Sequence, residues 1–237
     1  MLQLLLRRIM MSLTAGGAHK NGGRCYAGRY RSGRAVYFYD DMADGRLYRG
    51  KFWFSRKYYS HPLGKLTETA TGCFDGNIKE GRWTFANKTH GVSKKLVVSY
   101  AGGHHLGTYS YHSVCHSRVF GFKTLATTLR LTMAGGHPVG DIVCVLDGNL
   151  LTGRCDADGR PDGLWKMDMG KTAACRTDYE EWEHGVCKQS YSIDEATGLR
   201  TYTKNQIPDI VKRLVYSECL PLENLVKQGS SAWNGDF

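Results

Sequence analysis

Two stretches of the chain repeat one short pattern, in which Thr-Gly is followed by an Asp, a polar turn and then Gly-x-Trp. The first copy runs from Thr71 to Phe85 and the second from Thr152 to Met167, with one extra residue in the second turn. Internal self-similarity of this kind indicates a repeat architecture. Each copy has the form strand, turn, strand, so the pattern predicts an array of β-hairpins and says much less about function.

The composition supports the same fold class. The chain has 237 residues with 29 Gly but only 5 Pro, and it carries 14 Tyr, 8 Phe and 5 Trp. Glycine without a strict three-residue period excludes collagen and indicates many tight turns, while aromatic residues favour strands. We therefore predict an all-β protein, an elongated twisted sheet of antiparallel hairpins followed by a short C-terminal helix.

A shorter Gly-x-aromatic unit recurs along the same region. It occurs at Gly28-x-Tyr30, Gly50-x-Phe52, Gly72-x-Phe74, Gly81-x-Trp83, Gly107-x-Tyr109 and Gly163-x-Trp165. A residue two positions after the glycine lies on the same strand face, so stacked hairpins can align their rings in one core. We expect Trp83, Trp165, Phe52, Phe74 and Tyr109 in that core. We expect Gly72, Gly81, Gly153 and Gly163 at turns.

The remaining segments divide the chain into three regions. Residues 1–34 predict a basic, flexible arm or leader, 35–204 the repeat domain, and 205–237 a helix with a loose tail. Within the repeat domain, the segment from Ser55 to Thr69 is predicted to be a polar connection. Residues 119–133 are ambiguous, and their threonines favour strands. In the last region, apolar residues at helical spacing follow Pro208, and Pro221 interrupts them. We favour a helix that caps the open end of the sheet over one that docks a partner.

Two stretches resemble the MORN repeat (membrane occupation and recognition nexus), whose unit runs Tyr-x-Gly-x-aromatic, then an Asn/Gly/Lys turn, then Gly. They are Tyr48 to Phe52 and Gly72 to Gly81. Residues 100–109 and 179–187 look like degenerate copies. Trp83 and Trp165 stand where MORN units commonly have a second glycine, and this variant is similar to bacterial repeat proteins of gut and oral Bacteroidetes that have no assigned activity. The resemblance implies one twisted sheet of successive hairpins and a scaffold or binding role; it carries no defined binding residues.

The net charge of +10 is concentrated at the start of the chain. Residues 1–34 hold seven Arg and Lys and no Asp or Glu, which leaves +3 for the remainder. The arm is either a tail for an anionic partner or a leader preceding a true start at Met10 or Met11, and we favour the second interpretation. Nucleic acid is therefore not the expected partner of the body.

The spacing of the cysteines indicates whether the protein resides in a reducing or an oxidising compartment. None of the eight forms Cys-x-x-Cys or zinc-finger spacing, and several lie in apolar strand patterns such as 143–145 and 186–187. Free, buried thiols in the cytoplasm are the prediction, with disulfides as the alternative for an exported protein. Charges interrupt the opening apolar run in residues 1–13, which is unlike a signal peptide, although Arg7-Arg8 would allow one. No apolar run reaches the length of a membrane span.

Two clusters were weighed as sites. His104, His105, His112 and His116, with Cys115, form a metal-like group, but a histidine-bearing surface hairpin is the favoured interpretation. Asp178, Glu180, Glu181, Glu183, Asp194 and Glu195 form an acidic stretch, for which solvated charges are the favoured interpretation. We assign no catalytic, cofactor or metal residues and predict no cofactor.

The predicted function is a non-catalytic binding or scaffolding module for a protein or a membrane surface. Ligands would lie across the exposed face of the sheet. The alternatives are an enzyme of unrecognised type and a binder of anionic surfaces or nucleic acid through the basic arm.

Overall fold

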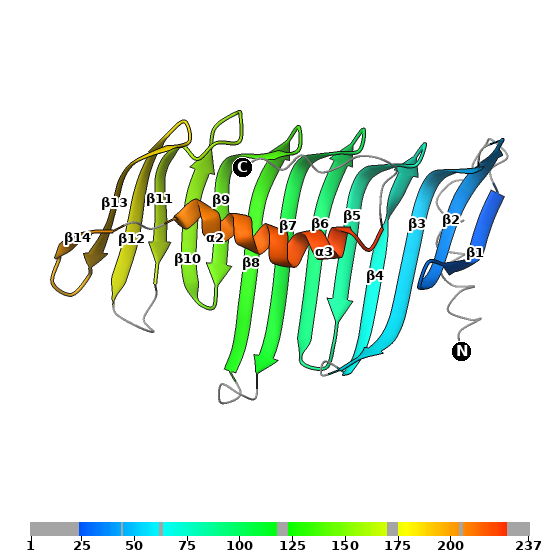
Figure 1. Ribbon diagram of the computed structural model, residues 1–237, viewed down its shortest axis with the longest axis horizontal. Coiled ribbons are helices and arrows are strands. Elements are labelled where there is room, and N and C mark those ends of the chain that lie inside the picture. Colours follow the sequence, from blue (N-terminus) through cyan, green and yellow to red (C-terminus); the bar gives the residue numbers. More distant parts are fainter. Residues whose placement is uncertain are drawn as a thin grey trace.

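The protein forms one open antiparallel sheet of fourteen strands, ordered as they occur in the sequence (Figure 1). The computed structural model describes residues 24–43, 45–61, 64–117, 123–169, 175–203 and 206–226. Every strand pairs with its neighbours in the chain, so the sheet is a meander of hairpins that includes both copies of the repeated pattern. The predicted all-β architecture with a short C-terminal helix is confirmed.

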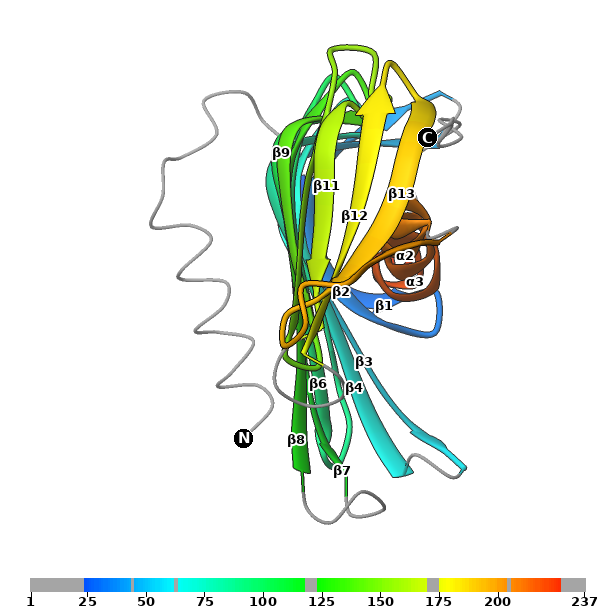
Figure 2. The same cartoon turned by 90° about the vertical axis from the view of Figure 1, so that its left-hand side faces the viewer.

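The strands differ widely in length. They are β1 (Arg24–Tyr30), β2 (Gly33–Met42), β3 (Gly45–Ser60), β4 (Gly64–Asp75), β5 (Ile78–Lys88), β6 (Val92–Ala101), β7 (His104–Ser117), β8 (Lys123–Ala134), β9 (His137–Leu146), β10 (Asn149–Cys155), β11 (Gly163–Asp168), β12 (Arg176–Glu183), β13 (Val186–Asp194) and β14 (Arg200–Tyr202). The longest strands lie in the first half of the sheet, where the hairpins extend well beyond the covering helix (Figures 1 and 2).

Among the described residues, one helical segment covers one face of the sheet. It comprises α2 (Ile207–Leu214), a π-helical turn η2 (Val215–Cys219) and α3 (Leu220–Glu223), and it crosses the strands from β11 to β5. We call the covered side the inner face and the opposite side the outer face (Figure 2). The predicted role as a cap on the open end of the sheet is wrong: the helical segment covers the apolar face of the sheet instead of its edge.

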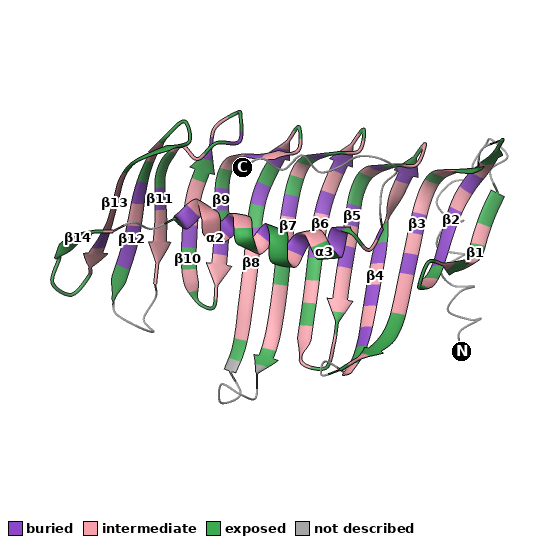
Figure 3. Ribbon diagram, in the orientation of Figure 1, coloured by how far each residue is buried: buried purple, intermediate pink, exposed green. Residues whose placement is uncertain are grey.

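The core lies between the helical segment and the inner face. The strands alternate buried and more exposed residues with period two, as a half-buried strand must (Figure 3). The helical segment contributes a buried stripe at spacings of three and four residues: Ile207, Val211, Val215, Cys219, Leu222 and Val226. A sheet only one layer thick thus obtains its second layer from these few helical turns.

Pro221 does not interrupt this helix, contrary to the sequence prediction. Proline has no backbone N–H to donate to the carbonyl one turn earlier, and in an ordinary α-helix its ring clashes there. The wider π-turn η2 directly precedes it, and the Leu220 N–H bonds the Val215 carbonyl five residues back. The helix therefore continues to Glu223, which places that carboxylate beneath α3.

Two other expectations are corrected. Strand β1 begins at Arg24, inside the segment predicted as a flexible arm, because the tyrosines of β1 pack on β2. Residues 1–23 of that predicted arm lie outside the described ranges.

The predicted connection from Ser55 to Thr69 consists mainly of strand, because Ser55–Ser60 belongs to β3 and Gly64–Thr69 to β4. Its polar side chains pair across the strands, as where Arg56 Nε donates to Glu68 Oε2 at 2.6 Å. Of residues 119–133, which lean towards strands in the sequence, those from Lys123 onward belong to strand β8, and 119–122 lie outside the described ranges.

The repeated pattern is a packing unit of glycine and tryptophan. The Trp83 ring lies on Gly72, where a Cβ atom would be 2.1 Å from Trp83 Cδ2, and Trp165 lies on Gly153 with a corresponding distance of 2.2 Å. Each indole then donates to the carbonyl that follows its glycine: Trp83 Nε1 to Cys73 O and Trp165 Nε1 to Arg154 O, both 3.0 Å. Because the indole N–H is satisfied, the rings are buried at no hydrogen-bonding cost.

The four glycines of the pattern were predicted at turns, but Gly72, Gly81 and Gly153 lie within strands and Gly163 begins one. They have two roles. Gly81 and Gly163 have positive φ, 65° and 75°, a backbone conformation that favours glycine. Gly72 and Gly153 make no turn; they leave the space that the indole fills. The turn between β4 and β5 uses Gly76 and Asn77, both with positive φ, as the sequence predicted.

The aromatic side chains predicted for the core are all buried. Trp83, Trp165, Phe52, Phe74 and Tyr109 are at most 4% exposed. Ring contacts connect β3, β4 and β5 on the inner face of the sheet. The ring centroids of Phe52 and Phe74 lie 5.2 Å apart, and those of Phe74 and Trp83 lie 5.0 Å apart. Both pairs are edge-to-face, a favourable arrangement. These contacts connect successive hairpins that would not be stable alone.

We expect Trp83→Ala to lower the free energy of unfolding by about 3–5 kcal/mol, since it removes a wholly buried ring and leaves a cavity. Urea denaturation at equilibrium measures the change. Leu164→Ala is the matched control, because Leu164 is 54% exposed on the outer face and should cost far less. Equal effects of the two substitutions would contradict the assigned burial.

The contact between Gly153 and the Trp165 ring can be tested by a double-mutant cycle. Gly153→Ala should destabilise the wild-type protein by roughly 1–3 kcal/mol, because the added methyl group overlaps the Trp165 ring. The same substitution in a Trp165→Ala background should cost clearly less, since the ring is gone. Additive effects of the two substitutions in urea denaturation would show that Gly153 and Trp165 do not pack together.

Candidate functional site

A buried polar cluster surrounds Glu223 at the end of the helical segment. Tyr109 Oη donates to Glu223 Oε1 at 2.8 Å, and Tyr100 Oη donates to Oε2 at 2.7 Å. The His105 Nε2 atom also lies 2.8 Å from Oε2. Lys79 Nζ donates to the Glu223 backbone carbonyl at 3.2 Å. Strands β5, β6 and β7 thus each place polar groups on one helical residue.

The cluster holds Glu223 in its charged form. Burial by itself raises the pKa of this carboxyl, but the hydrogen bonds from His105 and Tyr100 and the charge of nearby Lys79 outweigh it, so its pKa lies below the usual value. Burial lowers the pKa of Lys79 to about 8, although the Glu223 carboxylate favours its charged form. Burial, reinforced by the same carboxylate, raises the pKa of Tyr100 and Tyr109 well above the usual tyrosine value.

Two further carboxylates attach the same helical segment to the sheet. Glu180 of β12 accepts the Ile207 N–H at 3.1 Å, so the sheet supplies the cap that Gln206 does not. Near the middle, Glu218 Oε2 accepts from Tyr111 Oη at 2.8 Å and lies 2.5 Å from Lys94 Nζ. Polar contacts therefore fix both ends and the middle of the helical segment. Because the group around Glu223 is buried and both of its oxygens already accept hydrogen bonds, we interpret this cluster as a structural anchor.

The histidines singled out in the sequence are divided between the two faces. His105 is buried beside Glu223, whereas His104, His112 and His116 are exposed, on the outer face. Cys115, next to His116 in the strand, points to the inner side of β7. Across the described ranges, no three His, Cys, Asp or Glu side chains are grouped to hold a metal ion.

The acidic stretch is also divided, and the interpretation as solvated charges is wrong for two of its members. Asp178 and Glu180 are buried on the inner face, 1% and 0% exposed. Asp178 pairs with Arg176 Nε at 2.9 Å and accepts from Ser192 Oγ at 2.6 Å. Glu181 and Glu183 are exposed. Asp178 and Glu180 are two residues apart in β12, so they lie on the same face of the strand. The sequence did not show that this face is buried at Glu180, because the helix that covers it comes from a distant part of the chain.

The outer face has no helical cover among the described residues (Figure 2). In its first half, the registers from β1 to β8 place ten basic residues on this face: Arg29, Arg34, Arg49, Lys51, Lys57, Lys65, Arg82, Lys88, Lys95 and Arg130. The carboxylates on the same face of these strands are Asp40, Asp75 and Glu80. Because the basic residues outnumber the carboxylates, this half of the outer face is positively charged.

The centre of this basic surface is formed by Arg82, Lys95 and Arg130. All three side chains are exposed, and none forms an ion pair with another described residue. They come from β5, β6 and β8, whose registers keep them within one region of the sheet. Threonines separate them, including Thr84, Thr108 and Thr128. We call Arg82, Lys95 and Arg130 the central basic patch. Sequence reasoning missed it because strand register, and hence face, was unknown.

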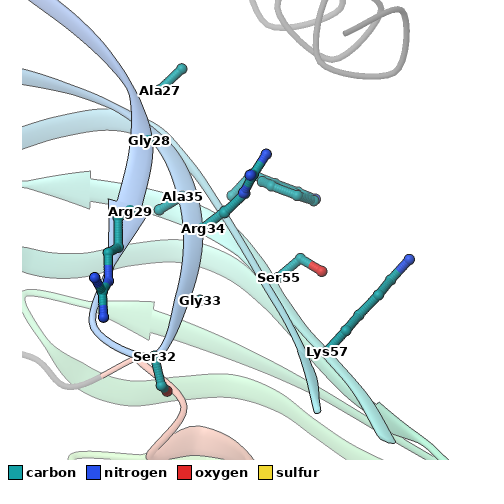
Figure 4. Close-up of a pocket in the computed structure, with 10 residues that line it drawn as sticks. Ala27, Gly28, Arg29, Ser32, Gly33, Arg34, Ala35, Ser55 and Lys57 are labelled. Carbon is teal, nitrogen blue, oxygen red and sulfur yellow. The ribbon is translucent and has the colours of Figure 1, made fainter. Parts of the chain in front are cut away.

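A groove lies at the end of the outer face, across β1, β2 and β3 (Figure 4). Its volume is about 730 Å³, and Arg29, Arg34, Lys57 and Trp53 contribute to its lining. Small residues such as Ala27 and Gly28 leave the space. Arg29 and Arg34 are direct cross-strand neighbours, but their side chains point away from each other (Figure 4). The groove therefore gathers positive charge beside an aromatic ring.

All eight cysteines are thiols and not disulfides. Cys144, Cys155 and Cys219 are buried as expected, and burial raises the pKa of Cys144 and Cys155 to about 12, which makes those thiols unreactive. Cys187, expected in an apolar strand environment, is exposed, as are Cys25 and Cys175. No helix in the described ranges is both long and apolar enough to cross a membrane.

Neither a known protein-family model nor a curated protein matches this chain. The MORN resemblance therefore stays a prediction.

We expect Glu223→Gln to destabilise the protein by about 3–5 kcal/mol at neutral pH, because it removes a buried charge while Lys79 remains buried beneath the helix. Since the folded-state pKa of Glu223 is lowered, its contribution is complete above the unfolded value of 4.5 and is lost as the pH falls through the folded value. The stability difference between wild type and variant should shrink on acidification.

Urea denaturation at a series of pH values measures this difference. Glu218→Gln is the control, because that carboxylate is 29% exposed and pairs with a partly exposed lysine, so its loss should cost at most about 1 kcal/mol. A Glu223→Gln effect that does not change between neutral and acidic pH would show that the carboxylate is not held charged.

Proposed function

We propose that this protein is a non-catalytic binding module whose outer face docks an acidic protein surface. The observation that carries the proposal is the division of charge between the two faces. Buried carboxylates fix the helix on the inner face, while the central basic patch remains exposed and unpaired among the described residues. Complementary charge of this kind steers association and selects partners.

The shape of the outer face favours a macromolecular partner. An open sheet of fourteen strands offers a broad surface, whereas a small substrate needs a concave site that surrounds it. The predicted MORN relationship would agree with a scaffolding role of this kind. Because all eight cysteines are thiols and not disulfides, we propose a reducing compartment, the cytoplasm.

The test uses poly-L-glutamate as a defined acidic probe, with binding measured by isothermal titration calorimetry at several salt concentrations. We expect binding that weakens steeply with salt, because exposed charges are screened. The triple variant Arg82→Glu, Lys95→Glu, Arg130→Glu should bind at least about tenfold more weakly. Thermal unfolding of the variant should match the wild type, since all three side chains are exposed.

The matched control is the triple variant Arg160→Glu, Lys188→Glu, Arg213→Glu, which makes the same change in net charge at exposed sites away from the patch. It should retain most of the binding. Equal losses in the two triple variants would contradict a localised surface. Tighter binding to duplex DNA than to poly-L-glutamate, lost in the patch variant, would replace the protein partner by nucleic acid.

A further inference from the structure

A histidine lies inside the central basic patch, at the position that its basic residues leave to β7. Arg82, Lys95 and Arg130 come from β5, β6 and β8, and β7 lies between the last two strands. His112 of β7 is the direct cross-strand neighbour of Lys95 on one side and of Thr128 on the other. It is exposed on the outer face, as the three basic residues are. The patch thus contains a titratable group that the proposed function does not use.

The charged side chains that face His112 from the neighbouring strands are cationic. Lys95 of β6 faces it directly, and Arg130 of β8 is its diagonal neighbour. Along β7 itself, the next titratable side chain on the outer face is His116. No Asp or Glu occurs in β6, β7 or β8. A proton on His112 is therefore not neutralised by any carboxylate of these three strands.

The surroundings of His112 couple its protonation to the binding of an anion. Histidine is the one side chain whose ordinary pKa, about 6.5, lets its charge change near neutral pH. In the free protein, a proton on the His112 ring is disfavoured by the charges of Lys95 and Arg130. A carboxylate that a partner places against the patch favours that proton. Binding of an acidic surface and protonation of His112 therefore favour each other, as linkage between two ligands requires.

We infer that His112 makes docking of the acidic protein partner pH-dependent: the partner binds together with a proton on His112, so association strengthens as the pH falls. The inference rests on the proposed function, because the same patch receives the partner. His112 then adds a positive charge to the three basic residues of the patch in the complex. His104 and His116, exposed on the same face of β7, lie farther from Lys95 along the strand and contribute less.

The test measures calorimetric binding of poly-L-glutamate to the full chain at constant ionic strength. The pH runs from about 8 to about 6, a range in which glutamate stays ionised and histidine titrates. We expect the affinity to rise about threefold over this range, the scale of one exposed ion pair. Titrations at about pH 6.5 in two buffers of different protonation enthalpy should show net proton uptake on binding.

Substitutions localise the proton. His112→Gln should remove most of the rise in affinity and most of the proton uptake, and change binding little at about pH 8. His112→Lys, which keeps its positive charge throughout the range, should bind about threefold more tightly than the wild type at about pH 8. The matched control is His184→Asn in the exposed β12–β13 turn, where asparagine accepts the positive φ of 47°. It should keep the pH dependence of the wild type.

Failure of the inference and failure of the proposed function give different results. Absence of poly-L-glutamate binding at every pH would overturn both. Binding that the triple variant Arg82→Glu, Lys95→Glu, Arg130→Glu loses, with proton uptake unchanged in His112→Gln, would overturn the inference alone. An equal loss of proton uptake in His184→Asn would also contradict it, because the protons would then not be localised at the patch.

Stability measurements accompany the binding data. The thermal unfolding midpoints of the histidine variants should match the wild type at both ends of the pH range, since both histidines are exposed. If His112→Gln is destabilised, His112→Lys carries the test. A pH dependence of binding in His112→Lys equal to that of the wild type would then overturn the inference.

Discussion

The contact between one apolar sheet face and one helical segment supports the whole structure. Fourteen strands in a single layer have an inner face that water would otherwise cover, and burial of apolar surface is the main favourable contribution to folding. The buried stripe from Ile207 to Val226 supplies the second layer. Because the segment is only a few turns long, it covers the middle of the sheet and leaves the far ends of β3, β4, β7 and β8 to stabilise themselves by cross-strand pairs.

Polar anchors determine where that segment lies. Apolar packing alone would tolerate a helix shifted along the sheet, since the inner face continues over many strands. Glu180 at one end and Glu223 at the other each meet specific donors from the sheet, and a buried carboxylate displaced from its donors is costly. Position and orientation of the helix are thus specified by hydrogen bonds, while the gain in free energy comes from burial.

The same anchors shape the surface available for binding. Glu180 and Glu223 point to the inner face, whereas Arg82, Lys95 and Arg130 point to the outer face. The central basic patch is a consequence of this separation.

The sequence by itself determined the hairpin array, the buried tryptophans and the position of the C-terminal helix in the chain, because period-two patterning, turn glycines and apolar spacing are local properties. The packing of Trp83 on Gly72 was not foreseen, since the two residues meet only through the register of β5 on β4. Only the tertiary structure decided that Glu180 and Glu223 are buried, that His105 and His112 lie on opposite faces, and that Arg29 and Arg34 share a groove. Those outcomes depend on which distant segment covers which face, and no local pattern encodes that choice.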